Sequence, residues 1–180
     1  MEVVTERTRH VLAYNFHTAP ENLNTLGKIR DRSCENTLVI APHAFFPGPV
    51  CLRGLLEENL GVFDAIEYSG FRVRGLNFNR RSTNLSGESG KPLVGCGDIH
   101  YLWQLDRTFT WIYAEPCVQS VLGAVKQGLV RIQSSPLSWR EAAGWWATTL
   151  WRYAFPVNPD PLNSIEDGRC LGAAQESIKS

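Results

Sequence analysis

The 180-residue sequence lacks the features that define several classes of protein. No apolar run approaches the roughly 20 residues that a membrane-spanning helix needs, so we expect no membrane partner. Residues 1 to 20 carry charges throughout, unlike a signal peptide. The 18 basic residues balance the 18 acidic ones, so the net charge does not indicate nucleic acid as a partner, and nucleic-acid binding would need a local basic groove.

The cysteines do not form a recognisable framework. There is no C-x-x-C pair, and the odd number argues against complete disulfide pairing. We therefore predict a reducing, cytoplasmic location. The five positions are Cys34, Cys51, Cys96, Cys117 and Cys170.

Three common catalytic motifs are also missing. The sequence has no G-x-S-x-G nucleophile elbow, no H-E-x-x-H helix and no convincing glycine loop for phosphate. Any chemistry must therefore come from residues that the fold brings together.

Segments of strand type alternate with segments of helix type, which predicts an α/β fold with parallel strands joined by covering helices. The expected strands are His10 to Phe16, Thr37 to Ala41, Ala65 to Tyr68, Leu93 to Cys96, Thr108 to Ala114 and Val130 to Gln133. The expected helices are Glu21 to Arg32, Leu52 to Asn59, Leu76 to Ser89, Val118 to Gln127 and Ser138 to Phe155.

The carboxyl-terminal part divides into two segments after the main domain of residues 1–137. Residues 138–155 form a tryptophan-rich helix, which we expect to pack on the core or to make a subunit contact. Ser138 and Glu141 have the spacing of a capping box at its start. In residues 156–180 proline, asparagine, aspartate and glycine dominate, which predicts a poorly ordered tail.

Two predicted strands run directly into candidate metal ligands. An apolar strand ends in glycines and then in Asp98-Ile99-His100, where alternation sends Asp98 and His100 to the same side. The strand Leu38 to Ala41 is followed by His43. The carboxyl ends of parallel strands converge, so these side chains can meet.

A third segment adds Glu2 and, eight residues later, His10. Each is weak evidence alone, but their coincidence with two further strand ends predicts a multi-metal hydrolase site. Carboxylate and imidazole ligands suit zinc, manganese or iron. The predicted ligands are Glu2, His10, His43, Asp98 and His100.

The same residues resemble the PHP (polymerase and histidinol phosphatase) domain family of metal-dependent phosphoesterases, from about Glu2 to Leu137. The resemblance depends on these motifs: Glu2-Val3-Val4 with His10-Val11-Leu12, Ile40-Ala41-Pro42-His43 with Phe45-Phe46-Pro47, and Gly97-Asp98-Ile99-His100. The stretches Gln104 to Thr110, Val118 to Gly128 and Ser135 to Ser138 resemble segments that follow them in the family.

The resemblance implies a partial distorted (β/α)7 barrel that binds up to three divalent cations. Glu2 would bridge two of them, His10 and His43 would complete the second, and Asp98 and His100 would serve the first and third. It further implies hydrolysis of a phosphate ester, from a small molecule or a nucleotide, by metal-activated water. Asp98 and His100 would then be catalytic.

The family's opening His-x-His and the Asp and His ligands after it have no counterpart here. The resemblance therefore implies a barrel without its amino-terminal third and an incomplete site. The alternative function is a non-catalytic PHP-like remnant that serves interaction or oligomerisation, for example in a homo-oligomer.

Three other features support weaker predictions. Glu67 lies near the end of a predicted strand and is expected either to support the metal ligands from behind or to lie at the barrel rim. Arg80 and Arg81 can bind a substrate phosphate through bidentate hydrogen bonds, although basic residues on a helix are commonly solvated. Cys96 ends an apolar strand and is expected to be a buried core thiol.

Overall fold

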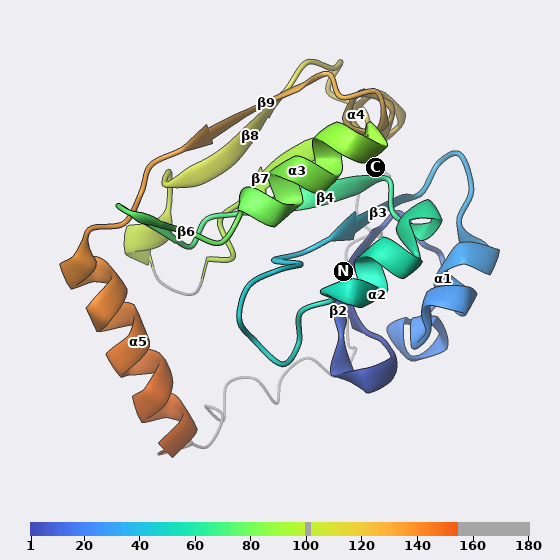
Figure 1. The fold of residues 1–180 in the computed structure, drawn as a ribbon. Helices are drawn as coiled ribbons and strands as arrows, with labels where there is room; N and C mark the ends of the chain where they lie inside the picture. Colours follow the sequence, from blue (N-terminus) through green and yellow to red (C-terminus); the bar gives the residue numbers. More distant parts are fainter. Residues whose placement is uncertain (100–101, 155–180) are drawn as a thin grey trace, which may run out of the picture. The chain divides into compact units, whose positions relative to one another are not determined.

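The computed structural model describes residues 1–99 and 102–154, which form a mixed α/β fold (Figure 1). The strands are β1 (Glu2–Val4), β2 (His10–Tyr14), β3 (Leu38–Ala41), β4 (Ala65–Ser69), β5 (Arg72–Val73), β6 (Leu76–Asn77), β7 (Leu93–Cys96), β8 (Thr108–Ile112) and β9 (Val130–Ser134). The α-helices are α1 (Leu26–Arg32), α2 (Gly54–Glu58), α3 (Arg80–Ser89), α4 (Val118–Lys126) and α5 (Trp139–Ala154). Four short 3-10 helices are η1 (Glu6–Thr8), η2 (Pro20–Leu23), η3 (Leu60–Val62) and η4 (Leu102–Gln104).

The main sheet has five strands in the order β1-β2-β3-β4-β7. Strand β2 is antiparallel to both β1 and β3, whereas β3, β4 and β7 are parallel. The pairs β5–β6 and β8–β9 form two small antiparallel sheets.

The predicted partial (β/α)7 barrel is therefore wrong. In residues 1–99 and 102–154 the strands form one open mixed sheet and two small sheets, with no closed barrel. A barrel of this type needs strands that all run parallel. Here β2 runs against both of its neighbours, and β8 runs against β9.

Most predicted elements were near the right place. The six expected strands correspond to β2, β3, β4, β7, β8 and β9, whereas β1, β5 and β6 were missed. The helix expected from Leu76 begins only at Arg80, because Leu76–Asn77 is strand β6. The helix expected from Glu21 is divided into η2 and α1. Phe155 and the predicted tail of residues 156–180 lie outside the described residues.

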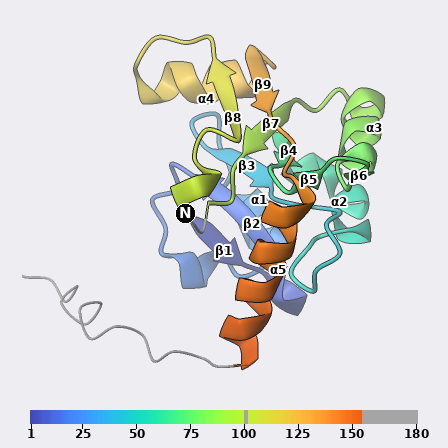
Figure 2. The same ribbon diagram turned by 90° about the vertical axis from the view of Figure 1, so that its left-hand side faces the viewer.

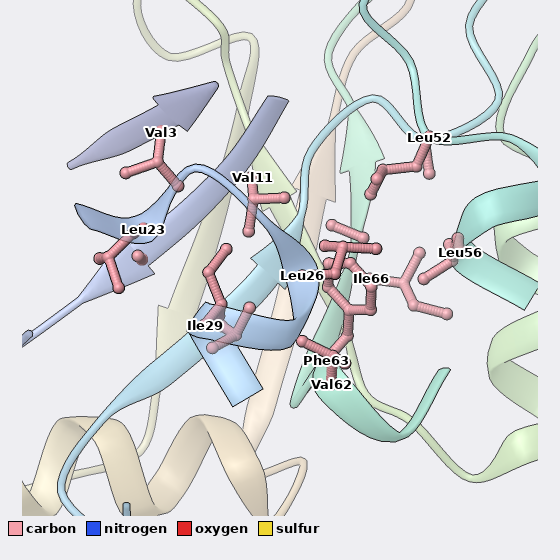
Figure 3. Close-up of a cluster of buried hydrophobic side chains, with 14 residues drawn as sticks. Val3, Val11, Leu23, Leu26, Ile29, Leu52, Leu56, Val62, Phe63 and Ile66 are labelled. Atoms are coloured by element: carbon pink, nitrogen blue, oxygen red, sulfur yellow. The ribbon is translucent and has the colours of Figure 1, made fainter. Parts of the chain in front are cut away.

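Two apolar clusters lie on opposite faces of the main sheet. The first lies between the sheet and helices α1 and α2, which stand in front of the sheet in Figure 1; α4 lies behind it. Figure 3 shows Val3 and Val11 of the sheet pointing toward Leu26 and Ile29 of α1. Fully burying one such side chain stabilises the fold by about 1.5–3 kcal/mol.

The second cluster joins the other face to α4 and consists of Leu38, Ile40, Ala65, Val94, Leu122 and Val125. Lys126 at the end of α4 donates to the carbonyl of Glu35 at 3.0 Å, and its Nζ lies 3.8 Å from Oδ1 of Asp64. These residues precede β3 and β4. Helix α4 therefore lies over the amino ends of β3 and β4.

The antiparallel pair β8–β9, whose strands are connected through α4, lies beside β7 (Figure 2). The side chain of Thr110 links this pair to β7. The hydroxyl of Thr110 accepts from the N–H of Gly95 at 2.7 Å and donates to its carbonyl at 2.9 Å. A Cβ at Gly95 would lie 2.8 Å from Cγ2 of Ile132, closer than real contacts allow. The close approach of the β8–β9 pair therefore requires glycine here.

Helix α5 begins with the predicted capping box, which is confirmed. The Ser138 N–H donates to Oε2 of Glu141 at 2.7 Å, and the Glu141 N–H donates to Oγ of Ser138 at 3.3 Å. Trp139, Trp146 and Trp151 on this helix are 62%, 41% and 62% exposed. Among the described helices, none is long and apolar enough to span a bilayer.

Candidate metal centre

The register of the main sheet places three ionisable residues on its α4 face. Leu12 packs on that face and pairs with Glu2. Directly paired residues share a face, and side chains alternate along each strand. Glu2 and His10 therefore share the α4 face. Glu67 also lies there, because it follows Ala65 of the same face by two residues.

Strand direction brings these residues to one end of the sheet. His10 begins β2, whose amino end lies beside the carboxyl end of the antiparallel β3, where His43 follows. Glu67 is the third residue of β4, and Asp98 follows β7 by two residues; both strands are parallel to β3. Of the five predicted ligands, Glu2, His10 and His43 come together, and His10 does so from the start of an antiparallel strand.

Glu2, His10 and His43 form a group that can hold a metal ion. One ligand atom from each residue lies within 4.8 Å of the others. Nδ1 of His10 lies 2.7 Å from Oε1 of Glu2, and the two imidazole rings meet edge to face with centroids 5.6 Å apart. The side chains of Glu2 and His10 are 49% and 25% exposed, so the group is open to solvent on one side.

A buried carboxyl group lies behind this group. Glu67 is 1% exposed, and its Oε2 accepts the backbone N–H of His43 at 3.1 Å. Its Oε1 has no hydrogen-bond partner within the described part of the chain. Burial raises the pKa of Glu67 to about 8, and the charges of Asp98 and Glu2 act in the same direction.

His43 is held in the form that binds metals. Burial lowers its pKa below the ordinary value for histidine, and it outweighs the opposing charge of Asp98. The imidazole is therefore neutral at neutral pH, as a metal ligand must be. Its Nδ1 lies 3.4 Å from Sγ of Cys51, and its backbone is left-handed with φ 31°.

Asp98 lies beside the group. Its negative charge raises the pKa of Glu67 and that of Cys96, so it is electrostatically part of the same site. Its backbone is left-handed with φ 42°, which is costly outside glycine and is common at functional sites. His100, the other half of the Asp-x-His motif, lies outside the described residues.

The structure also gives the surroundings of Arg80 and Arg81, which were predicted to bind a substrate phosphate, and of Cys96. The Arg81 guanidinium binds both carboxylate oxygens of Glu57, at 2.8 and 2.6 Å, and lies 4.6 Å from the Phe45 ring centroid. Arg80 is exposed at the start of α3. Cys96 is half-buried rather than fully buried, and burial raises the pKa of its thiol.

Sequence reasoning missed the role of Cys51. For Glu67 it predicted a place either behind the metal ligands or at the barrel rim, and the contact with the His43 backbone fits the first of these. Cys51 lies eight residues after His43 and is 1% exposed. No local pattern predicts its contact with the imidazole. For Glu67 a signal existed, since it is a charged residue within an otherwise apolar strand.

The residues fit a divalent cation. Two imidazoles and one carboxylate are a donor set found in catalytic zinc sites that keep a position open for water or substrate. A nearby positive charge would also compensate the buried Glu67 oxygen that lacks a partner. The part of the chain that the structure describes thus contains a potential metal-binding group, Glu2, His10 and His43.

Comparison with known proteins adds evidence on the fold alone. No protein-family model matches the sequence, and no curated protein matches it. Among solved structures, the chain is similar to the crystal structure of PsfC from Pseudomonas syringae PB-5123, with a TM-score of 0.55 and 15% sequence identity. The match covers 85% of this chain and 64% of that one, so this chain spans less than two thirds of its length. Membership of the PHP family stays a prediction.

Proposed function

We propose that the protein is a metal-dependent phosphoesterase that hydrolyses a phosphate ester of a small molecule or a nucleotide. The observation that supports this proposal most directly is the convergence of Glu2, His10 and His43. A divalent cation held there, zinc, manganese or iron, supplies Lewis-acid activation of water and of a phosphoryl oxygen. The choice of phosphate esters follows the sequence resemblance to the PHP family.

The proposed roles of the residues around the metal centre follow from their exposure to solvent. Glu2 and His10 are partly exposed and form the side of the centre that substrate reaches. His43 is half-buried and fixes the inner side. Asp98 adds negative charge beside the centre and is the residue that we expect to orient or deprotonate the attacking water.

Metal binding and hydrolysis by the full chain test the proposal. The purified protein should bind Co²⁺ or Mn²⁺ and hydrolyse a generic phosphomonoester or phosphodiester with Mn²⁺ added. His43→Ala should weaken metal binding because it removes one of three ligands. Asp98→Ala should lower the rate of hydrolysis more than it lowers metal affinity.

His17 provides a matched control, because it is an exposed histidine outside the group. His17→Ala should change neither metal affinity nor hydrolysis. A wild-type protein that binds no divalent cation and hydrolyses neither ester would contradict the proposal.

The exposed tryptophans of α5 favour a second candidate function, association with another protein or another copy of the chain. Trp139 and Trp151 are each 62% exposed. Large exposed aromatic side chains are enriched at protein interfaces. Sedimentation of wild type and Trp139→Ala across a range of concentrations tests it, and a monomer at every concentration would leave no support for self-association.

A further inference from the structure

Two buried residues contact His43 from different directions. Oε2 of Glu67 accepts its backbone N–H at 3.1 Å, and Sγ of Cys51 lies 3.4 Å from its Nδ1. Both Glu67 and Cys51 are 1% exposed, so these contacts lie inside the protein. Glu67 therefore holds the backbone of His43 from within, and Cys51 contacts its imidazole ring.

We propose that Cys51 is a positioning residue of the metal centre, whose sulfur engages Nδ1 of His43 and directs Nε2 of that ring toward the cation. The inference rests on the metal site of the proposed function. A neutral imidazole has one N–H donor and one acceptor nitrogen. If Nε2 gives its lone pair to a metal, Nδ1 carries the hydrogen and needs an acceptor. In this structure the sulfur of Cys51 stands at that place.

The loop that carries Cys51 is folded so that it reaches both histidines of the group. The Phe46 N–H donates to the carbonyl of His43 at 2.9 Å, and the Arg53 N–H donates to the carbonyl of Ala44 at 2.8 Å. These hydrogen bonds fold the loop back toward His43. The carbonyl of Val50, immediately before Cys51, accepts the backbone N–H of His10 at 3.0 Å.

The dipeptide Val50–Cys51 therefore links the two imidazole ligands. It holds His10 through the main chain and His43 through a side chain. Partners of this kind, which touch a ligand and not the metal, commonly change metal affinity by about 10- to 100-fold when they are removed. We expect a change of that size for Cys51.

Cobalt binding to the full-length protein and to its Cys51→Ala and Cys51→Ser variants tests the inference. Cys51→Ala should weaken Co²⁺ binding by about 10- to 100-fold and alter the visible absorption of the bound ion. Cys51→Ser keeps a hydrogen-bonding atom and should recover most of the affinity. The exposed Cys34 gives the matched control, and Cys34→Ala should bind like wild type.

Each other outcome has a distinct meaning. Wild-type protein that binds neither Co²⁺ nor Mn²⁺ and hydrolyses neither ester overturns the proposed function and this inference with it. Normal binding by Cys51→Ala overturns the inference alone. A thiolate-to-cobalt charge-transfer band in wild type that Cys51→Ser abolishes also overturns it, because Cys51 would then be a ligand. Equal thermal stability of the metal-free variants separates loss of positioning from loss of folding.

Discussion

The buried carboxyl of Glu67 should make the stability of the metal-free protein depend on pH. Its pKa is raised to about 8 in the folded chain, mainly by burial, from an ordinary value near 4.5. Below pH 4.5 the group is protonated in both the folded and the unfolded state and carries no penalty. Above that pH the unfolded chain ionises while the folded chain keeps its proton, so the free energy of unfolding falls until about pH 8.

The magnitude follows from the two pKa values. Each pH unit between them lowers the free energy of unfolding by about 1.4 kcal/mol, so the whole penalty approaches about 5 kcal/mol. Glu67→Gln keeps an oxygen that can accept the His43 N–H and has no proton to lose. The free energy of wild type minus that of the variant should therefore fall by about 4 kcal/mol between pH 5 and pH 8.

Urea unfolding in EDTA at pH 5, 6, 7 and 8 measures this difference. Comparing the two proteins at each pH cancels the other groups, including His43, whose lowered pKa acts in the opposite direction. Glu88→Gln makes the same chemical change at an exposed glutamate of α3 and serves as the matched control. If Glu67→Gln behaves like Glu88→Gln, the carboxyl is not buried as described and the reasoning fails.

Three further predictions concern packing and helix capping. Gly95→Ala should lower the free energy of unfolding by about 2 kcal/mol, because its Cβ would meet Ile132 at 2.8 Å. Gly87→Ala in α3, with nothing within 4 Å of the new Cβ, should raise it by about 0.5–1 kcal/mol; urea unfolding of both variants checks the contrast. Ser138→Ala should destabilise the start of α5 by about 1 kcal/mol, measured by thermal melting. Hydrogen bonds from Ser138 lower the pKa of Glu141, so this cap stabilises at neutral pH and weakens as the pH falls through the acidic range where Glu141 becomes protonated.

The sequence was a better guide to which side chains lie close together than to the directions of the strands. The strand end after Ala41 indicated His43, whereas Glu2 and His10 were predicted mainly through the resemblance to the PHP family, and these three side chains do form one group. The direction of β2 was not predictable, because the residues between β2 and β3 contain a helix in either arrangement. A pattern of apolar and polar residues records which face a side chain takes and leaves strand polarity open.

The elements that the sequence missed are the short ones. Strand β1 has three residues and β5 and β6 have two each, too few to show a period. A buried contact fixes the segment after β6: the side-chain amide of Asn79 accepts from the N–H of Ser69 at 2.8 Å and donates to its carbonyl at 2.9 Å. Contacts between residues ten apart leave no local signal, and the same holds for Cys51 and His43.

Because Glu2 lies on the edge strand β1, metal binding should affect how often this strand opens. Strand β1 is three residues long and pairs with β2 alone in the main sheet of the described chain. Such margins open most readily, and each opening would carry Glu2 away from the histidines. A cation bound by Glu2, His10 and His43 would oppose this fraying, since a ligand of the closed form stabilises it by mass action. Slower amide hydrogen exchange along β1 would then report loading of the centre directly.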